Sequence, residues 1–273
     1  MTQPRDWTKE SSETLVDYRV DGGVAVLTLS DPPANTYSYA MMRQLDAAIL
    51  RARFDETAHV ILVTGAGEKF FCAGANIQML GEVSPTFKYF FCLHANETLQ
   101  RLEQTPKLVI AAINGHCVGG GLEVALAADL RFCAQGTFKV GLPEVGLGVL
   151  PGTGGTQRLT RLVGRAKALE LMLDGKNLSV AQAHAAGLIT RVAPGLAPFL
   201  TEALAFAREF TPPGKASMAV GHIKRAVATG ADLSLADGLA LERELQQRLF
   251  ESDDAGEGIA AFNAKRPPKF SGR

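Results

Sequence analysis

The sequence predicts an α/β core over residues 14–195 and a C-terminal helical region over residues 196–273. In the first part of the chain, short apolar runs bounded by turn residues alternate with segments of helical periodicity. Beyond Pro194 every segment has helical periodicity. Strands that alternate with helices are typical of layered α/β proteins. The change of pattern near Pro194 therefore separates an α/β core from a helical region. The polar residues 1–13 are expected to form a flexible N-terminal segment.

The first elements are predicted to be a β-hairpin and a helix. Residues 15–20 and 24–29 have strand-like patterns, and the turn between them contains two glycines. A helix is then expected from about residue 38 to residue 54. Its apolar face consists of Met41, Leu45, Ala48, Ile49 and Ala52.

The middle of the chain continues with further strands and turns. Residues 59–64 and 108–113 are apolar runs that predict buried strands, and residues 70–76 form a turn of small residues. A helical region spans about residues 84–104, and a helix-like segment at 124–128 follows the second strand. The later segments are predicted as strands at 130–134 and 188–192, and as helices at 155–162, 165–174, 179–186, 198–210, 215–229, 234–251 and 253–263.

The composition argues against several classes of protein. Lys plus Arg equals Asp plus Glu, 28 each, so no overall basic field attracts nucleic acid or an anionic membrane. No apolar run approaches the ~20 residues of a membrane span. The N-terminus lacks the apolar core of a signal peptide, so a cytoplasmic location is expected.

Cysteine and histidine spacing does not predict a metal site. The four cysteines contain no C-x-x-C pair, and the five histidines contain no H-x-x-x-H pair. The cysteines are expected to be reduced and packed in apolar surroundings.

A glycine-rich turn after the 108–113 strand is the most informative motif. Gly119, Gly120 and Gly121 can bring backbone N–H groups close to an anionic oxygen, because they carry no side chains. The turn delivers Glu123 into the first turn of the following helix. Close packing of helix and strand would also explain the glycines, and Glu123 could simply complement the helix dipole.

A second carboxylate, Glu144, precedes another glycine-rich turn at residues 151–156. Two acids beside donor-rich turns suggest proton transfer next to a stabilised oxyanion. Two nearby carboxylates titrate as a coupled pair, so one can hold a proton while the other acts as base. A solvated loop acid is the alternative interpretation of Glu144.

The motifs at residues 73–77, 113–123 and 142–159 closely resemble those of the crotonase superfamily, and enoyl-CoA hydratases in particular. The resemblance runs from about Leu15 to Phe270 and includes residues 257–266. It implies a spiral of ββα units with a C-terminal helical trimerisation region. It also implies an acyl-CoA thioester substrate of fatty-acid β-oxidation type and a homotrimer or a dimer of trimers.

The resemblance assigns roles to particular residues. The backbone N–H groups of Ala75 and Gly120 would form the oxyanion hole for the thioester carbonyl. Glu123 and Glu144 would hold the water that adds syn across the C2–C3 double bond of a trans-2-enoyl-CoA, and Gly152 would help to bind that water. The CoA-binding positions would be Ala73, Asn76, Ile77, Phe262 and Lys265. No cofactor or metal is implied, because coenzyme A is part of the substrate.

Three positions depart from the family pattern. Asn76 replaces an acidic residue, Gln78 replaces a lysine that commonly meets the CoA phosphates, and Tyr37 replaces an aliphatic residue. Tyr37 either shapes the acyl pocket or simply packs. The acyl pocket is expected to involve residues 79–103, which include the aromatic residues Phe87, Tyr89, Phe90 and Phe91.

Other activities remain open at this point. An enoyl-CoA isomerase, or a hydratase for a branched or aromatic acyl-CoA, is the nearest alternative, although two glutamates favour hydration. An RNA-binding or scaffold protein on the same fold is a remote alternative that zero net charge disfavours.

Overall fold

The computed structural model describes residues 6–273 and contains two β-sheets with helices packed around them. The larger sheet has six strands in the order β1-β2-β3-β5-β7-β10. β1 and β2 form an antiparallel hairpin, and the remaining neighbours are parallel. These strands are Val16–Asp21, Val24–Leu29, Val60–Gly65, Leu108–Ile113, Leu130–Cys133 and Arg191–Val192. The predicted α/β core is confirmed.

The smaller sheet was not predicted. It has the order β4-β6-β8-β9, with strands Phe70–Cys72, His116–Val118, Lys139–Gly141 and Leu178–Ser179. The first three strands run parallel, and β9 pairs antiparallel with β8. Three successive strand pairs, β3–β4, β5–β6 and β7–β8, thus pass from the large sheet to the small one before the chain continues into helices. This repeat is the spiral of ββα units that the resemblance implied.

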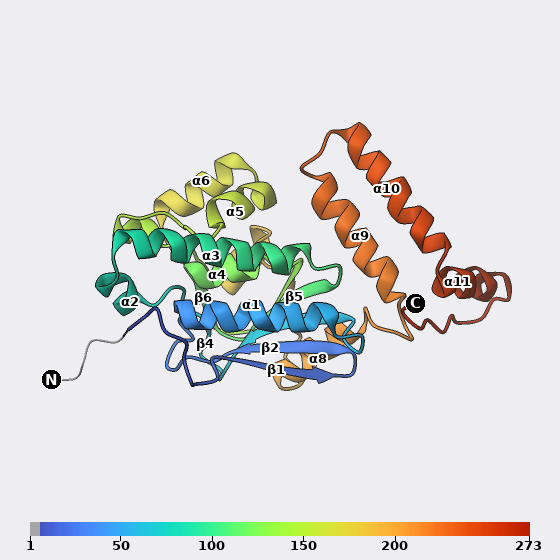
Figure 1. Cartoon of the computed structure of the whole chain (residues 1–273), viewed down its shortest axis with the longest axis horizontal. Coiled ribbons are helices and arrows are strands. Elements are labelled where there is room, and N and C mark those ends of the chain that lie inside the picture. The colour runs from blue at the N-terminus through green and yellow to red at the C-terminus, as the bar shows by residue number, and fades with distance from the viewer. Residues whose placement is uncertain (1–5) are drawn as a thin grey trace.

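Helices cover both faces of the large sheet (Figure 1). α1, Tyr39–Phe54, and α3, Pro85–Gln104, lie on one face. Ser38 caps the N-terminus of α1, because its side chain accepts the Met41 N–H. α8, Phe199–Arg208, covers the other face, where Phe206 stacks on Phe132 of β7 with ring centroids 4.9 Å apart. The alternate side chains of the central strands therefore belong to two separate apolar clusters.

The remaining helices connect the sheets and complete the core. They are α2 (Ile77–Glu82), α4 (Gly120–Leu126), the 3₁₀ helix η1 (Glu144–Leu147), α5 (Gly155–Val163), α6 (Arg165–Asp174) and α7 (Val180–Ala185). α4 begins four residues before the predicted segment 124–128, because the glycines themselves form its first turn. The predicted strand 188–192 is shorter than expected, since only Arg191–Val192 pair with β7.

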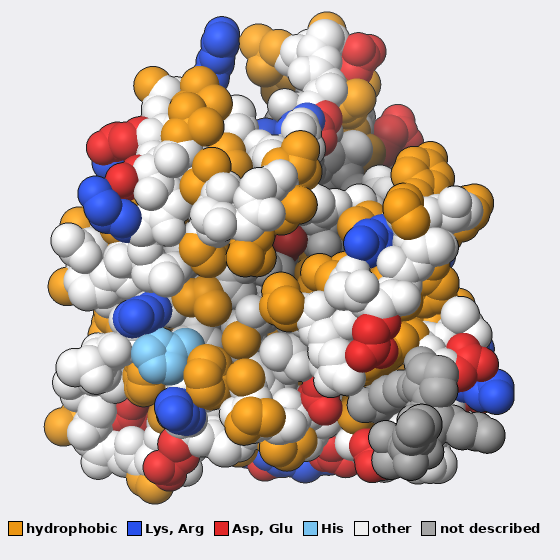
Figure 2. All heavy atoms as spheres, turned by 90° about the vertical axis from the view of Figure 1, so that its left-hand side faces the viewer, with side chains coloured by type: hydrophobic (Ala, Val, Ile, Leu, Met, Phe, Trp, Pro, Cys, Tyr) orange, Lys and Arg blue, Asp and Glu red, His pale blue; other side chains and the backbone are white. Residues whose placement is uncertain are grey.

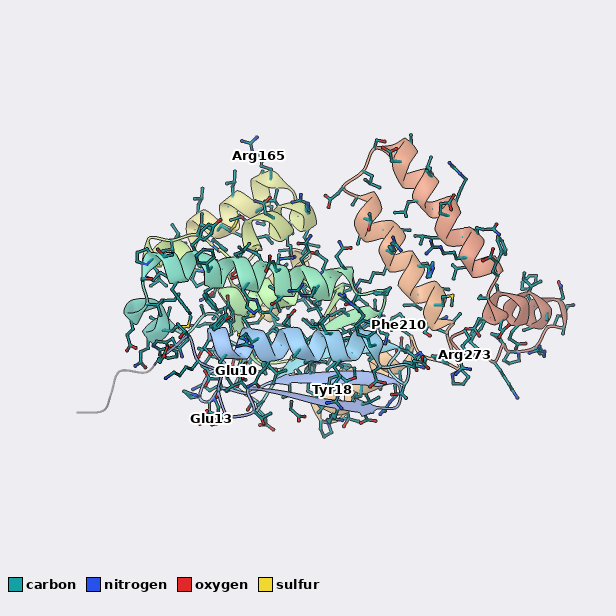
Figure 3. The ribbon with its side chains drawn as sticks, viewed as in Figure 1. Glu10, Glu13, Tyr18, Arg165, Phe210 and Arg273 are labelled. Carbon is teal, nitrogen blue, oxygen red and sulfur yellow. The ribbon has the colours of Figure 1, made fainter. Side chains whose placement is uncertain are left out.

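The C-terminal helices form an arm that extends away from the core (Figure 1). α9, Ser217–Gly230, packs against α10, Leu235–Phe250, and α11 spans Asp253–Asn263. Lys224 of α9 anchors the arm, because its ammonium group lies 2.9 Å from the Asp129 carboxylate. The chain then returns to the junction of α9 and α11, where Arg273 lies (Figure 3), and the Arg273 carbonyl accepts the Asp254 N–H.

Part of the predicted N-terminal segment 1–13 contacts the core. Trp7 is buried, and its indole N–H donates to Glu82 of α2 at 2.7 Å. Residues 1–5 of the segment lie outside the described residues. Among residues 6–273, no helix is long and apolar enough to cross a membrane.

Candidate active site

A cavity of about 380 Å³ contains both glutamates singled out in the sequence. Its polar end is formed by the two glutamates and by the turns around Gly74, Gly120 and Gly152. Its walls are largely apolar and include Tyr37, Ile77, Leu80, Phe91, Cys92, Leu147, Val149 and Leu150. Figure 2 shows a hollow near the middle of the molecular face beside α2, bordered largely by hydrophobic side chains. An apolar cavity with a few convergent polar groups is typical of a small-molecule site.

Glu123 is held at the polar end by backbone donors from another segment. Its side chain is only 2% exposed, and Oε1 accepts the N–H groups of Thr153 and Gly155, each at 2.7 Å. Burial raises the pKa of Glu123, whereas these N–H groups and the Thr153 hydroxyl act in the opposite direction. The two backbone bonds occupy one carboxylate oxygen and fix the orientation of the other.

Glu144 lies in η1 and lines the same cavity. Burial is the main reason that the pKa of Glu144 rises from its ordinary 4.5 to about 7, and the charge of Glu123 adds to the effect. Its Oε2 atom is buried and has no hydrogen-bond partner among the described residues. Oε1 lies beside the glycine turn, since a Cβ on Gly119 would be 3.2 Å from it. Glu144 can therefore hold and release a proton near neutral pH.

The turns at residues 73–75 and 119–121 bring two backbone N–H groups to the cavity. Ala75 N–H donates to no acceptor among the described residues, and Gly120 N–H belongs to the first residue of α4, which has no intrahelical acceptor. The turns touch, because a Cβ on Gly74 would be 2.9 Å from the Gly120 nitrogen. A positive φ of 57° at Gly119 lets the chain enter α4 at this angle. Both donors are available to an oxygen in the cavity.

The structure brings together most of the predicted site residues. Ala73, Ala75, Ile77, Gly120 and Gly152 line the cavity together with both glutamates. The predicted roles of these residues in binding CoA, carbonyl oxygen and water stay predictions.

Three of the predicted CoA-binding residues lie elsewhere. The side chain of Asn76 caps α2 by accepting the Met79 N–H at 3.0 Å, and Asn76 is not among the residues that line the cavity. Phe262, which is 84% exposed, and Lys265 belong to the C-terminal arm and do not line this cavity either. Within one chain, α11 and α2, which contributes Ile77 and Leu80 to the cavity, are at opposite ends of the molecule (Figure 1).

Several residues of the site were not singled out from the sequence. Thr153 and Gly155 lie within the glycine-rich turn 151–156, but nothing in the spacing indicates that their N–H groups bond Glu123. Phe91 is one of several aromatic residues in its segment, and burial distinguishes it: Phe91 is 3% exposed, whereas Tyr89 and Phe90 are more than half exposed. The ring of Phe91 lies 6.0 Å from that of Tyr37, and the two rings form one wall.

No group of three or more His, Cys, Asp or Glu side chains suited to hold a metal ion occurs among residues 6–273. All four cysteines are free, and three of them are buried. The expectation that the reaction uses no metal or other cofactor stays a prediction.

Comparisons with known proteins agree with this geometry. The family described as enoyl-CoA hydratase/isomerase matches residues 19–273. A probable enoyl-CoA hydratase of Rhizobium meliloti is 40% identical over 96% of this chain and 100% of its own length. A probable enoyl-CoA hydratase of Bacillus subtilis is 37% identical over 94% of this chain and 98% of its own length.

Solved structures show the same likeness in three dimensions. The crystal structure of an enoyl-CoA hydratase from Bacillus anthracis superposes with a TM-score of 0.89 at 32% identity. The superposition covers 95% of this chain and 100% of that one. The chain therefore belongs to the enoyl-CoA hydratase/isomerase family of the crotonase superfamily and is an enzyme of that family.

Proposed function

We propose that this enzyme adds water syn across the C2–C3 double bond of a trans-2-enoyl-CoA and releases a 3-hydroxyacyl-CoA. The observation that carries the proposal is the placement of two carboxylates and two available backbone N–H donors around one apolar cavity. The thioester carbonyl makes C3 electrophilic, so this reaction requires no redox chemistry.

The geometry suggests how the charge is distributed during the reaction. The N–H groups of Ala75 and Gly120 bind the thioester oxygen and stabilise the enolate that forms when water attacks C3. Glu123, fixed by its two backbone donors, orients the water and takes one of its protons. Glu144 delivers a proton to C2 as the enolate collapses to the thioester.

The protonation states fit this division of roles. A carboxyl group whose pKa is about 7 is available as an acid at neutral pH, as Glu144 requires. Glu123 accepts two backbone N–H hydrogen bonds that favour its charged form, as a base requires. After each turnover one proton must pass from Glu123 back to Glu144, and the product or bulk water can carry it.

The cavity suggests where the acyl end of the substrate binds, and the resemblance suggests where its CoA end binds. The acyl chain would lie against the wall formed by Tyr37 and Phe91. The resemblance places Phe262 and Lys265 at the CoA of a neighbouring subunit, and we propose a homotrimer or a dimer of trimers on this basis. Exposed leucines such as Leu235 and Leu239 on α10 suit an assembly in which another copy covers part of the arm.

Loss of the conjugated enoyl-thioester absorbance of crotonyl-CoA tests the proposal. Wild-type protein should remove the absorbance rapidly, and Glu123→Gln and Glu144→Gln should each lower kcat by several orders of magnitude. Glu68→Gln, which changes an exposed acid on a loop, is the matched control and should retain the wild-type rate. A folded wild-type protein that consumes 3-enoyl-CoA but hydrates no 2-enoyl-CoA would instead indicate an isomerase.

A further inference from the structure

The hydroxyl group of Tyr37 is buried beside the glutamates, although the proposed reaction does not use it. Tyr37 is 2% exposed, and its hydroxyl lies 3.0 Å from the hydroxyl of Thr153, which is 4% exposed. The two residues are 116 positions apart in the sequence. Two hydroxyl groups that are buried against each other at the polar end of the cavity need hydrogen-bond partners within the protein.

Thr153 connects this hydroxyl pair to Glu123. Its backbone N–H donates to Glu123 Oε1 at 2.7 Å. Its side chain is held in turn by the hydroxyl of Tyr37 at 3.0 Å, where either hydroxyl can be the donor. The position of Thr153, and with it one N–H donor to the Glu123 carboxylate, therefore depends on the bond between the two hydroxyl groups.

Tyr37 is held in this position from two sides. Its backbone N–H donates to the Gly74 carbonyl at 2.9 Å, and its own carbonyl accepts the Asn76 N–H at 2.9 Å. Its phenol oxygen lies against Gly120, where an added Cβ would collide with it. The phenol is therefore fixed between the turn at residues 73–75 and the first turn of α4.

We propose that Tyr37 and Thr153 form a hydrogen-bonded hydroxyl pair that positions the Glu123 carboxylate for its action on water. The proposal rests on the proposed function and extends it to two residues that do not themselves touch the reacting atoms. Tyr37 is a positioning residue that acts through Thr153. A hydrogen bond from a backbone N–H to a charged carboxylate is worth more than one between neutral groups, so a displacement of Thr153 is expected to affect catalysis measurably.

The charged and titratable groups that face Glu123 come from several elements. Tyr37 and Cys92 act on it without carrying a positive charge, and Glu144 is a second acid in the cavity lining. Arg158 of α5 is the one cation among the causes that act on Glu123, and it lowers the pKa of Glu123 less than the hydrogen bonds do. The hydrogen bonds from Thr153 and Gly155 are thus the main influence that lowers the pKa of Glu123, whereas burial raises it. A weaker bond from the Thr153 N–H, once Thr153 has lost its hydroxyl partner, should raise the pKa of Glu123.

Kinetics of Tyr37→Phe, Thr153→Val and the double variant on crotonyl-CoA test the pair. Each variant removes one hydroxyl at nearly constant volume. We expect kcat to fall about tenfold in each with KM little changed, because Thr153 loses the bond that holds it and its N–H no longer fixes the carboxylate as well. The double variant should match the single variants, since either change breaks the same chain of bonds. The acid limb of the kcat profile should move to higher pH in all three.

Two control variants distinguish a positioning role of the hydroxyl groups from a general disturbance of the structure. Tyr39→Phe removes a hydroxyl two residues along the chain, where the ring packs on Phe87 and His94 outside the cavity, and it should leave kcat unchanged. Thr153→Ser keeps the hydroxyl and should restore most of the activity lost in Thr153→Val. Additive losses in the double variant, or equal losses in Thr153→Ser and Thr153→Val, would overturn the proposal.

Isotope-edited infrared titration of labelled glutamate carboxyl groups gives a readout that does not depend on turnover. The Glu123 band is identified by its absence in Glu123→Gln, and its titration should move to higher pH in Tyr37→Phe. An unmoved titration would refute the pair even in an active enzyme. If wild-type protein hydrated no enoyl-CoA while the band still moved, the proposed function would fail and the hydroxyl pair would stand.

Discussion

Replacing Glu144 by glutamine is expected to stabilise the protein at alkaline pH while it removes the acid of the proposed reaction. Burial raises the pKa of Glu144 from 4.5 to about 7. One pKa unit corresponds to about 1.4 kcal/mol, so the ionised carboxylate destabilises the folded state by about 3 kcal/mol at high pH. A neutral glutamine of similar shape lacks that cost.

The sign of the effect follows from proton binding. Between pH 4.5 and about 7 the folded protein keeps the Glu144 proton, whereas the unfolded chain has lost it. The folded state therefore binds more protons, and the free energy of unfolding falls as the pH rises through this window. Wild-type protein and Glu144→Gln should have similar free energies of unfolding near pH 4.5. As the pH rises, the variant should become steadily more stable than the wild type until the pH passes the folded-state pKa.

Urea unfolding at several pH values measures the difference. Protein concentration is held constant, because assembly would make the apparent stability depend on it. The gain of Glu144→Gln over wild type should approach about 3 kcal/mol above pH 8, and Glu68→Gln should show no such gain. Parallel pH curves for wild type and Glu144→Gln would refute the reasoning that burial perturbs this carboxyl group.

Three further substitutions test the arm, the glycine turn and the acyl wall. Lys224→Met removes the buried ammonium group and leaves the partly buried Asp129 carboxylate without its cation, so it should lower the free energy of unfolding by about 3 kcal/mol, measured in urea. Gly121→Ala places a methyl group on the Cys72 carbonyl and should destabilise the protein by at least about 3 kcal/mol, measured by thermal unfolding. Phe91→Ala enlarges the cavity, so the ratio of kcat/KM for a longer 2-enoyl-CoA to that for crotonyl-CoA should rise.

Each of these variants has a matched control on the same chain. Lys167→Met removes an exposed lysine, and Gly256→Ala adds a methyl group where nothing lies within 4 Å. Phe90→Ala removes a neighbouring ring that is 59% exposed and does not line the cavity. Equal effects in a variant and its control would contradict the corresponding explanation, as would a Phe91→Ala enzyme with unchanged chain-length preference.

The large sheet and the long helices could be predicted from the sequence because their patterns are long enough to read. β2 and β5 are six-residue apolar runs, and α1 has five apolar residues at helical spacing. The small sheet was missed because its strands are two or three residues long and show no periodicity. The pairing of β4 with β6 also depends on a close approach of the two segments, since a Cβ on Gly115 would collide with the backbone of Lys69.

The cavity itself was only partly predictable. Glu123 and Glu144 lie beside glycine-rich turns, which suggests a site but also fits a helix-dipole acid and a solvated loop acid. The resemblance of the surrounding motifs to a known family is what favoured both as site residues. The bonds from Thr153 and Gly155 to Glu123 join segments about thirty residues apart, and local patterns carry no information on such contacts. The sequence is compatible with either packing or pocket shaping by Tyr37, and the structure shows that it both packs and lines the cavity.

The most direct test of the proposed hydration is the fate of crotonyl-CoA in water enriched in heavy oxygen and deuterium. The account predicts a 3-hydroxybutyryl-CoA that carries the heavy oxygen at C3 and one deuterium at C2, with both added on the same face, as seen by mass spectrometry and NMR. A product with deuterium but no oxygen from the solvent would show double-bond migration instead. Addition on opposite faces would contradict the arrangement of Glu123 and Glu144 around a single water.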